Sequence, residues 1–133
     1  MKTDRKEEKG GETMNNSLKA LQAFTDETRL RIINLLYERE LCVCDLEAIL
    51  GTAQAKISRH LALLRNADLV RHRKIAQWSF YSLQGTGLAK FVNELVLGVL
   101  RKEDVYRNDL ELLKKKAEDG ICQTDVALKR RSK

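Results

Sequence analysis

Two short helical patterns separated by one glycine, with an alternating basic segment directly behind them, constrain the fold of this chain more than any other feature. Residues 45–50 predict about two helical turns that end at Gly51, and Thr52 can cap a second helix over residues 53–66. The expected buried face of that second helix consists of Ala53, Ile57, Leu61 and Leu64. Residues 69–83 alternate with period two, which predicts a β-hairpin. Helix, glycine turn and helix form a DNA-binding layout, in which the hairpin is a candidate wing.

Amphipathic helices are predicted on both sides of this unit. A helix over residues 16–25 carries Leu18, Leu21 and Phe24 on one face. Asp26 or Thr25 can cap the next helix, which runs to residue 39. Its expected buried stripe is Leu30, Ile33, Leu36 and Tyr37. Behind the hairpin, one long helix is predicted from residue 86 to residue 113, with more apolar surface than a small core can hide. We therefore expect a mainly α-helical homodimer.

Composition favours one compact domain without a membrane segment. The 133 residues contain no Pro, 33% charged residues and 43% hydrophobic residues. No apolar run approaches the roughly 20 residues that span a bilayer, and the N-terminal stretch lacks the apolar core of a secretory signal. We expect a cytoplasmic protein with a disordered arm over residues 1–15, a folded domain over residues 16–113 and a flexible basic tail over residues 114–133.

The positive charge is concentrated in the middle of the chain. The net charge is +6, and residues 54–77 contain six basic residues against one acidic residue, which favours a nucleic-acid partner. The candidate DNA-contacting residues of the second helix are Gln54, Lys56, Ser58, Arg59 and His60. Gln54 and Arg59 have the side chains that read adenine and guanine edges, whereas Lys56 and Ser58 are better suited to the phosphate backbone. His60 is either a phosphate donor or a structural histidine.

Three cysteines remain to be explained. An odd number of thiols in a reducing compartment fits metal ligands or reactive groups better than a disulfide framework, although each is also a candidate for plain burial. Cys42 and Cys44 would point about 200 degrees apart on one helix. They can therefore share an ion only if Cys42 lies outside the helix, where the helix N-terminus is expected to lower the thiol pKa.

Three motifs make the chain similar to the winged-helix repressors of the ArsR/SmtB family, over residues 18–100. They are the opening helix pair at residues 20–33, the run Glu-Leu-Cys-Val-Cys-Asp-Leu at residues 40–46, and the run Ser-Arg-His-Leu-Ala-Leu-Leu-Arg at residues 58–65. The resemblance implies a winged helix-turn-helix dimer that binds an inverted-repeat operator. It also implies wing contacts to the minor groove or phosphates from Arg71, Arg73, Lys74 and Gln77. The glycine common at the family's wing tip is absent here.

The resemblance also narrows the ligand. Arsenic sensors of the family often carry a third cysteine three positions beyond the second, where this chain has Glu47, so Cys122 is the expected third thiol. Cadmium and lead sensors of the family add thiols from an N-terminal arm, but residues 1–41 of this chain contain no Cys. Zinc and nickel sensors place His on the long helix, but residues 86–113 contain no His. Three sulfurs suit trivalent arsenic or antimony. Arsenite or antimonite is the expected inducer, with bismuth and cadmium as alternatives.

These features predict a repressor, not an enzyme. An ion drawn to Cys42 and Cys44 would distort the start of the helix-turn-helix and release DNA. A thiol enzyme is poorly supported, because the chain has no Cys-x-x-Cys and no glycine-rich phosphate loop. A thiol redox switch, a cadmium or lead sensor of the same fold, and a nucleic-acid binder without a sensor remain as alternatives.

Overall fold

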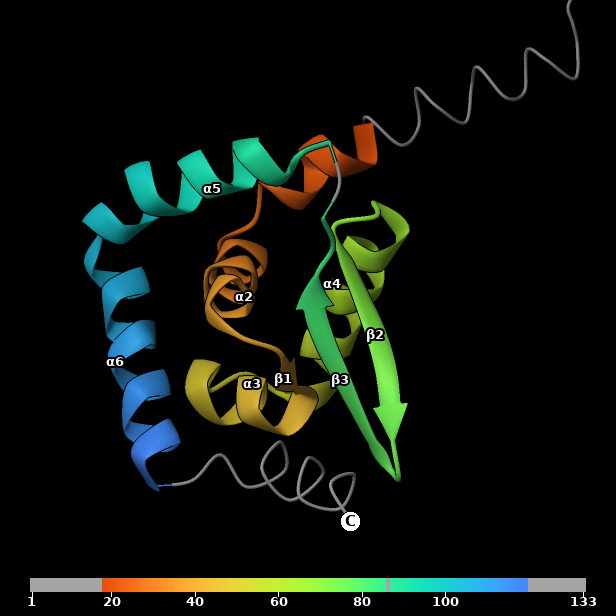
Figure 1. Cartoon of the computed structure of the whole chain (residues 1–133), viewed down its shortest axis with the longest axis vertical. Coiled ribbons are helices and arrows are strands. Elements are labelled where there is room, and N and C mark those ends of the chain that lie inside the picture. The colour runs from red at the N-terminus through yellow and green to blue at the C-terminus, as the bar shows by residue number, and fades with distance from the viewer. Residues whose placement is uncertain (1–17, 86, 120–133) are drawn as a thin grey trace, which may run out of the picture.

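The computed structural model describes residues 18–85 and 87–119 (Figure 1). A first helix covers residues 18–23. The elements that follow are α2 (Glu27–Glu38), β1 (Leu41–Cys42), α3 (Val43–Leu50), α4 (Gln54–Asn66), β2 (Val70–Ile75), β3 (Trp78–Leu83), α5 (Ala89–Gly98), the 3-10 turn η1 (Leu100–Lys102) and α6 (Asp104–Asp119). The predicted class, mainly helical with a small hairpin, is confirmed. Among the described helices none has the length and apolar character needed to cross a membrane.

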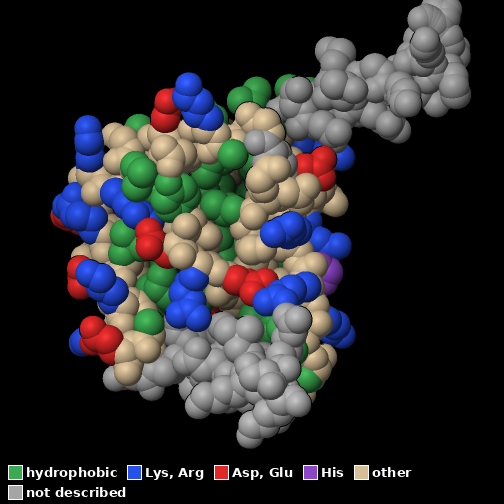
Figure 2. All heavy atoms as spheres, in the orientation of Figure 1, with side chains coloured by type: hydrophobic (Ala, Val, Ile, Leu, Met, Phe, Trp, Pro, Cys, Tyr) green, Lys and Arg blue, Asp and Glu red, His purple; other side chains and the backbone are tan. Residues whose placement is uncertain are grey.

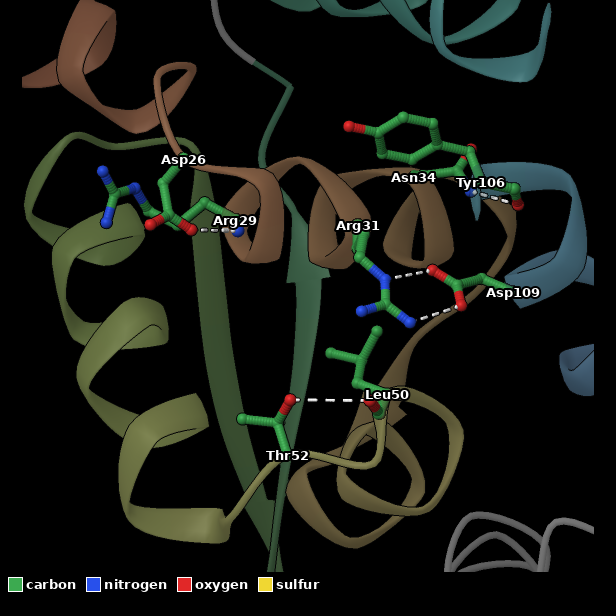
Figure 3. A network of polar contacts seen from close by, with 8 residues as sticks. All are labelled: Asp26, Arg29, Arg31, Asn34, Leu50, Thr52, Tyr106 and Asp109. Atoms are coloured by element: carbon green, nitrogen blue, oxygen red, sulfur yellow. Dashed lines mark hydrogen bonds and ion pairs between the residues drawn. The ribbon is translucent and has the colours of Figure 1, made fainter. Parts of the chain in front are cut away.

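Helix α2 forms the centre of the core. Its N-cap is Asp26, whose carboxylate accepts a hydrogen bond from the Arg29 backbone N–H at 3.1 Å, as the sequence predicted (Figure 3). The buried residues of α2 are Ile32, Ile33, Asn34, Leu35 and Leu36. Ile33 and Leu36 of the predicted stripe are buried, whereas Leu30 and Tyr37 are only partly buried. Burial also extends beyond the stripe, because other helices and the hairpin pack around α2 (Figure 1).

The helix-turn-helix is present, with one correction to its caps. Helix α3 begins at Val43 and ends at Leu50, and its C-cap is Gly51, whose φ of 66° is a left-handed conformation that glycine adopts without strain. Helix α4 begins at Gln54 behind an Ala53 N-cap, so the predicted Thr52 cap is wrong. The Thr52 hydroxyl instead donates to the Leu50 carbonyl at 3.5 Å (Figure 3).

The inner face of α4 is nearly as predicted. Ile57, Leu61 and Leu64 are fully buried. Ala53 is exposed, because it precedes the first turn and lies outside the helical periodicity. Burial of Ile57, Leu61 and Leu64 thus orients α4, so that the opposite face of the helix is exposed to solvent.

The hairpin joins a third short strand. The antiparallel sheet has the order β1-β3-β2, so β3 lies between the strand that carries Cys42 and the outer strand of the wing. Ala76 follows β2 directly and has a φ of 57°. It therefore occupies at the wing tip the left-handed conformation for which glycine is usually selected.

The single long helix predicted behind the hairpin is wrong. Helix α5 ends at Gly98, and Val99 leaves helical geometry at φ −126° and ψ −60°. Glycine and a β-branched residue in succession have low helix propensity, which favours a break at this position. After η1 the chain changes direction, and α6 packs against α2 and α3 (Figure 1). Helix α6 runs through the boundary predicted at residue 113 and ends at Asp119.

Polar contacts fasten α6 to α2. The Arg31 guanidinium donates two hydrogen bonds to the Asp109 carboxylate, at 2.8 and 2.9 Å (Figure 3). The Asn34 side-chain amide, which is fully buried, donates to the Tyr106 carbonyl at 3.1 Å. Because Asp109 is 2% exposed, its charge depends on Arg31 for compensation.

Hydrophobic side chains also reach the surface. The first helix lies next to α5 (Figure 1). Phe24, directly after the first helix, makes an edge-to-face contact with Phe91 of α5, with ring centroids 5.1 Å apart. The exposed hydrophobic residues of these two helices and the turn after α5 are Leu18, Leu21, Phe91, Leu97 and Val99. Figure 2 shows hydrophobic side chains at the surface beside α5. The buried side of the first helix carries Ala20 and Ala23 instead.

The Arg31–Asp109 pair gives the first prediction. We expect Arg31→Leu to lower the free energy of unfolding by about 3 kcal/mol, because it leaves a buried carboxylate without its partner. Urea unfolding measures this loss. The matched control is Arg107→Leu, which removes a more exposed ion pair with Asp104 on the same helix and should cost less than about 1 kcal/mol. Equal losses in the two variants would contradict the role given to Arg31.

Candidate DNA interface and thiol site

The outer face of α4 carries the residues that the sequence proposed for DNA contact. Gln54, Lys56, Ser58 and Arg59 are exposed on α4, while the opposite face of the helix is buried. The N-cap of α4 has no side-chain hydrogen bond. The first-turn N–H groups are thus uncapped by a side chain, and such groups attract phosphate.

His60 differs from its neighbours on α4, because its side chain is only 12% exposed. Its Nδ1 lies 3.1 Å from an Arg29 guanidinium nitrogen, and its Nε2 lies 4.0 Å from Asp26 Oδ1. Burial lowers the pKa of the imidazole; Asp26 opposes this shift and Arg29 adds to it. A neutral imidazole at this place joins α4 to the start of α2. The sequence allowed a structural role for His60, and this geometry favours that reading over phosphate contact.

The wing carries the second set of proposed DNA contacts. Arg71, Lys74 and Gln77 are exposed on the hairpin, as is Arg73. Arg73, however, already has a partner: its guanidinium donates to both carboxylate oxygens of Glu40, at 2.8 and 2.7 Å. The hydrogen bond from this pair raises the pKa of Arg73. Contact of Arg73 with phosphate would have to compete with Glu40.

The two thiols of the Cys-Val-Cys motif lie in different environments. Cys42 is the N-cap of α3 and 2% exposed, whereas Cys44 lies in the first turn of the helix and is exposed. The condition derived from the spacing is met, since Cys42 lies outside the helix. Neither thiol is in a disulfide.

The expectation of a lowered thiol pKa is wrong for Cys42. Burial raises the pKa of this thiol to about 12, and the negative charge of Asp45 adds to the increase. A backbone hydrogen bond from Asp45, at the helix N-terminus, lowers the pKa but does not offset burial. The Cys42 thiol donates to Asp45 Oδ2 at 3.2 Å. Cys42 is therefore a protonated, hydrogen-bonded thiol in this state.

The third expected thiol, Cys122, lies outside the described residues. Within residues 18–85 and 87–119, no group of three His, Cys, Asp or Glu side chains is arranged to hold a metal ion. The three-thiol site of Cys42, Cys44 and Cys122 stays a prediction.

Sequence reasoning missed three residues around the thiols. Asp45 accepts the Cys42 thiol, Glu40 binds Arg73, and Phe80 packs on Cys42. The position of Asp45, three residues after a helix N-cap, is a capping-box signal that could have identified it. The other two depend on strand pairing that the sequence does not specify.

The fold and the basic surface of α4 and the wing define a winged-helix DNA-binding protein. Residues 26–72 match the model of the family described as "Bacterial regulatory protein, arsR family". The arsenic resistance transcriptional regulator ArsR2 of Pseudomonas putida is 37% identical over 107 residues, which cover 76% of this chain and 92% of that protein. The chain belongs to the arsR family, which is a family of bacterial regulatory proteins and not of enzymes.

Two further comparisons agree. The arsenical resistance operon repressor of Escherichia coli is 51% identical over 67 residues, which cover 50% of this chain and 57% of that protein. The chain thus spans little more than half of that relative. The solved structure of HlyU from Vibrio cholerae matches with a TM-score of 0.57 at 36% identity, over 62% of this chain and 90% of that one. It supports the winged-helix fold.

The unequal environments of the thiols predict unequal reactivity. With an alkylating reagent at pH 8, we expect Cys44 to be modified well before Cys42, because Cys42 is buried and protonated. Since thiolate is the reactive form, the rate at Cys42 should rise about tenfold per pH unit while the pH stays below its pKa. Peptide mass spectrometry measures both rates. In urea the two thiols should react alike; equal rates in the folded protein would show that Cys42 is not protected.

Proposed function

We propose that this protein is a metalloid-responsive transcriptional repressor. It binds operator DNA as a homodimer and releases it when arsenite or antimonite binds cysteine thiolates. The observation that carries the proposal is the position of the thiol pair, at the first turn of α3 and directly ahead of the recognition helix α4. The names of the Escherichia coli and Pseudomonas putida relatives, which refer to arsenical and arsenic resistance, support the choice of ligand.

In the DNA-bound state, α4 enters the major groove. Gln54 and Arg59 read base edges, and Lys56 and Ser58 hold phosphates. The exposed basic residues of the wing reach the neighbouring minor groove or backbone. Helix α4 and the hairpin that follows it lie on the same side of the molecule (Figure 1), which supports a DNA-binding surface shared by both.

Dimerisation uses the apolar surface of the first helix and α5. Leu18 and Leu21 are 58% and 62% exposed, which is unfavourable for a single chain in water. Phe91 and Leu97 extend the same apolar character along α5. A twofold dimer places two recognition helices about 34–36 Å apart, in successive major grooves, and so requires an inverted-repeat operator.

The third thiol is supplied by Cys122. Helix α6 packs against α3 and ends at Asp119, three residues before Cys122. Three residues span at most about 10 Å, and this short connection starts from a helix that the Arg31–Asp109 pair anchors to α2. Three sulfurs without nitrogen suit a trivalent, three-coordinate ion such as arsenite or antimonite.

The main test compares DNA affinity with and without arsenite. We expect arsenite to weaken operator binding by about 5- to 150-fold in the wild type, the usual range of coupling between two sites. Cys42→Ser and Cys44→Ser should both fail to respond to arsenite, and Cys44→Ser, which changes an exposed thiol, should keep wild-type DNA affinity. Cys122→Ser should respond more weakly. Gel-shift titration with purified protein measures all four affinities.

Two results would overturn this proposal. One is a full arsenite response in both Cys42→Ser and Cys44→Ser. The other is release by peroxide but not by arsenite, which would assign the thiols to redox sensing instead. Release by cadmium or lead alone would assign the same fold to a different ion.

A second test separates base reading from phosphate contact. Arg59→Ala should lower operator affinity by about 1–3 kcal/mol and relax the preference for one base pair. Lys56→Ala should weaken operator and unrelated DNA about equally and reduce the salt dependence of binding. Fluorescence anisotropy at several salt concentrations measures both effects. Loss of discrimination in Lys56→Ala, with none in Arg59→Ala, would reverse the assigned roles.

A further inference from the structure

One row of residues crosses all three strands of the sheet. Cys42 in β1 pairs with Phe80 in β3, and Phe80 pairs with Arg73 in β2. Residues paired directly across antiparallel strands point to the same face of a sheet. The candidate ligand Cys42 and the candidate DNA contact Arg73 therefore lie in one row, separated only by Phe80.

The face that carries this row has a small core of its own. Cys42 and Phe80, at 2% and 1% exposed, form a buried cluster separate from the main core. Ile75 and Trp78, the residues at the tip of the wing, pack against it. Cys42 is thus part of the packing of the hairpin as well as the start of α3.

An ion pair closes the same row. Glu40 lies two residues before Cys42, and its carboxylate accepts hydrogen bonds from Arg73 Nε at 2.8 Å and from Arg73 Nη2 at 2.7 Å. This pair joins the segment before β1 to the outer strand β2. The β1 strand contributes only two paired residues, so the ion pair and the Cys42–Phe80 contact are major parts of the attachment.

We propose that Glu40 and Phe80 are positioning residues that couple the thiol pair to the wing. This inference rests on the proposed function. In the ligand-free state, the Glu40–Arg73 pair and the packing of Cys42 on Phe80 hold the wing on β1. When arsenite binds, Cys42 forms a sulfur–arsenic bond, and one hydroxyl of As(OH)3 leaves as water with the thiol proton. The sulfur then moves away from Phe80, β1 separates from β3 and the Glu40–Arg73 pair opens. The basic wing then loses its fixed position relative to α4.

The Glu40–Arg73 pair stabilises the ligand-free arrangement, which arsenite must disrupt in order to bind. The proposal therefore predicts that a variant without the pair has a higher arsenite affinity than the wild type. Loss of the pair should make arsenite bind more tightly to the DNA-free protein, because less has to be broken. We expect about a two- to fivefold gain in affinity, the range that a partly exposed ion pair can supply. A variant that merely damaged the fold would bind arsenite more weakly.

The experiment measures arsenite affinity of the full-length protein by titration calorimetry in Glu40→Gln and Arg73→Gln. Both variants break the pair but change the local charge in opposite directions. Tighter arsenite binding in both variants supports the role given to the Glu40–Arg73 pair. Tighter binding in one variant and weaker binding in the other would assign the effect to charge and overturn the proposal. Glu38→Gln is the matched control, since it breaks an ion pair with Arg101 away from the wing and should leave arsenite affinity unchanged.

Hydrogen exchange locates the change. Arsenite should accelerate amide exchange in residues 78–83 of the wild type but not of Cys42→Ser. Without arsenite, Glu40→Gln should already show faster exchange in these residues. Unchanged protection of β3 in arsenite-loaded protein that has released DNA would overturn the wing inference and leave the proposed function standing. Failure of arsenite to release DNA from the wild type would overturn both.

Discussion

Cys42 belongs to two elements at once, and this double membership is the constraint on which the rest of the site depends. Its backbone pairs with Phe80 in the sheet, and the same residue is the N-cap of α3. Because α3 is joined to α4 by a tight turn at Gly51, we expect a displacement at Cys42 to reach α4. Because β3 is the central strand, the same displacement reaches the wing. One buried residue is thus connected to both parts of the proposed DNA interface, to the wing by strand pairing and to α4 through α3.

The opposite side of the helix-turn-helix is held firmly. His60 connects α4 to Arg29 and Asp26 at the start of α2, and the Arg31–Asp109 pair connects α2 to α6. These contacts attach α2 to α4 on one side and to α6 on the other. A displacement of α3 or of the wing would therefore be a movement relative to α2. A switch between two discrete arrangements requires one part that stays in place and one part that moves. In this account α2 and α6 stay in place, and β1 and the wing move.

The helix-turn-helix, the hairpin and the exposed face of α4 could be predicted because periodicity and Gly51 specify them locally. The break at Val99 could not, since the apolar pattern continues across it and the return of α6 depends on tertiary contacts with α2. The pKa of Cys42 was predicted in the wrong direction, because sequence shows the helix terminus but not burial. The Glu40–Arg73 pair joins residues 33 positions apart and depends on strand register.

Reciprocity offers the most direct test of the claim that thiol ligation and DNA binding oppose each other through this unit. The measurement is the arsenite affinity of the protein, free and saturated with operator DNA. Thermodynamic linkage requires DNA to weaken arsenite binding by the same factor by which arsenite weakens DNA binding, about 5- to 150-fold. We expect this equality in the wild type. Equal arsenite affinity in the free and DNA-bound protein would contradict the coupling.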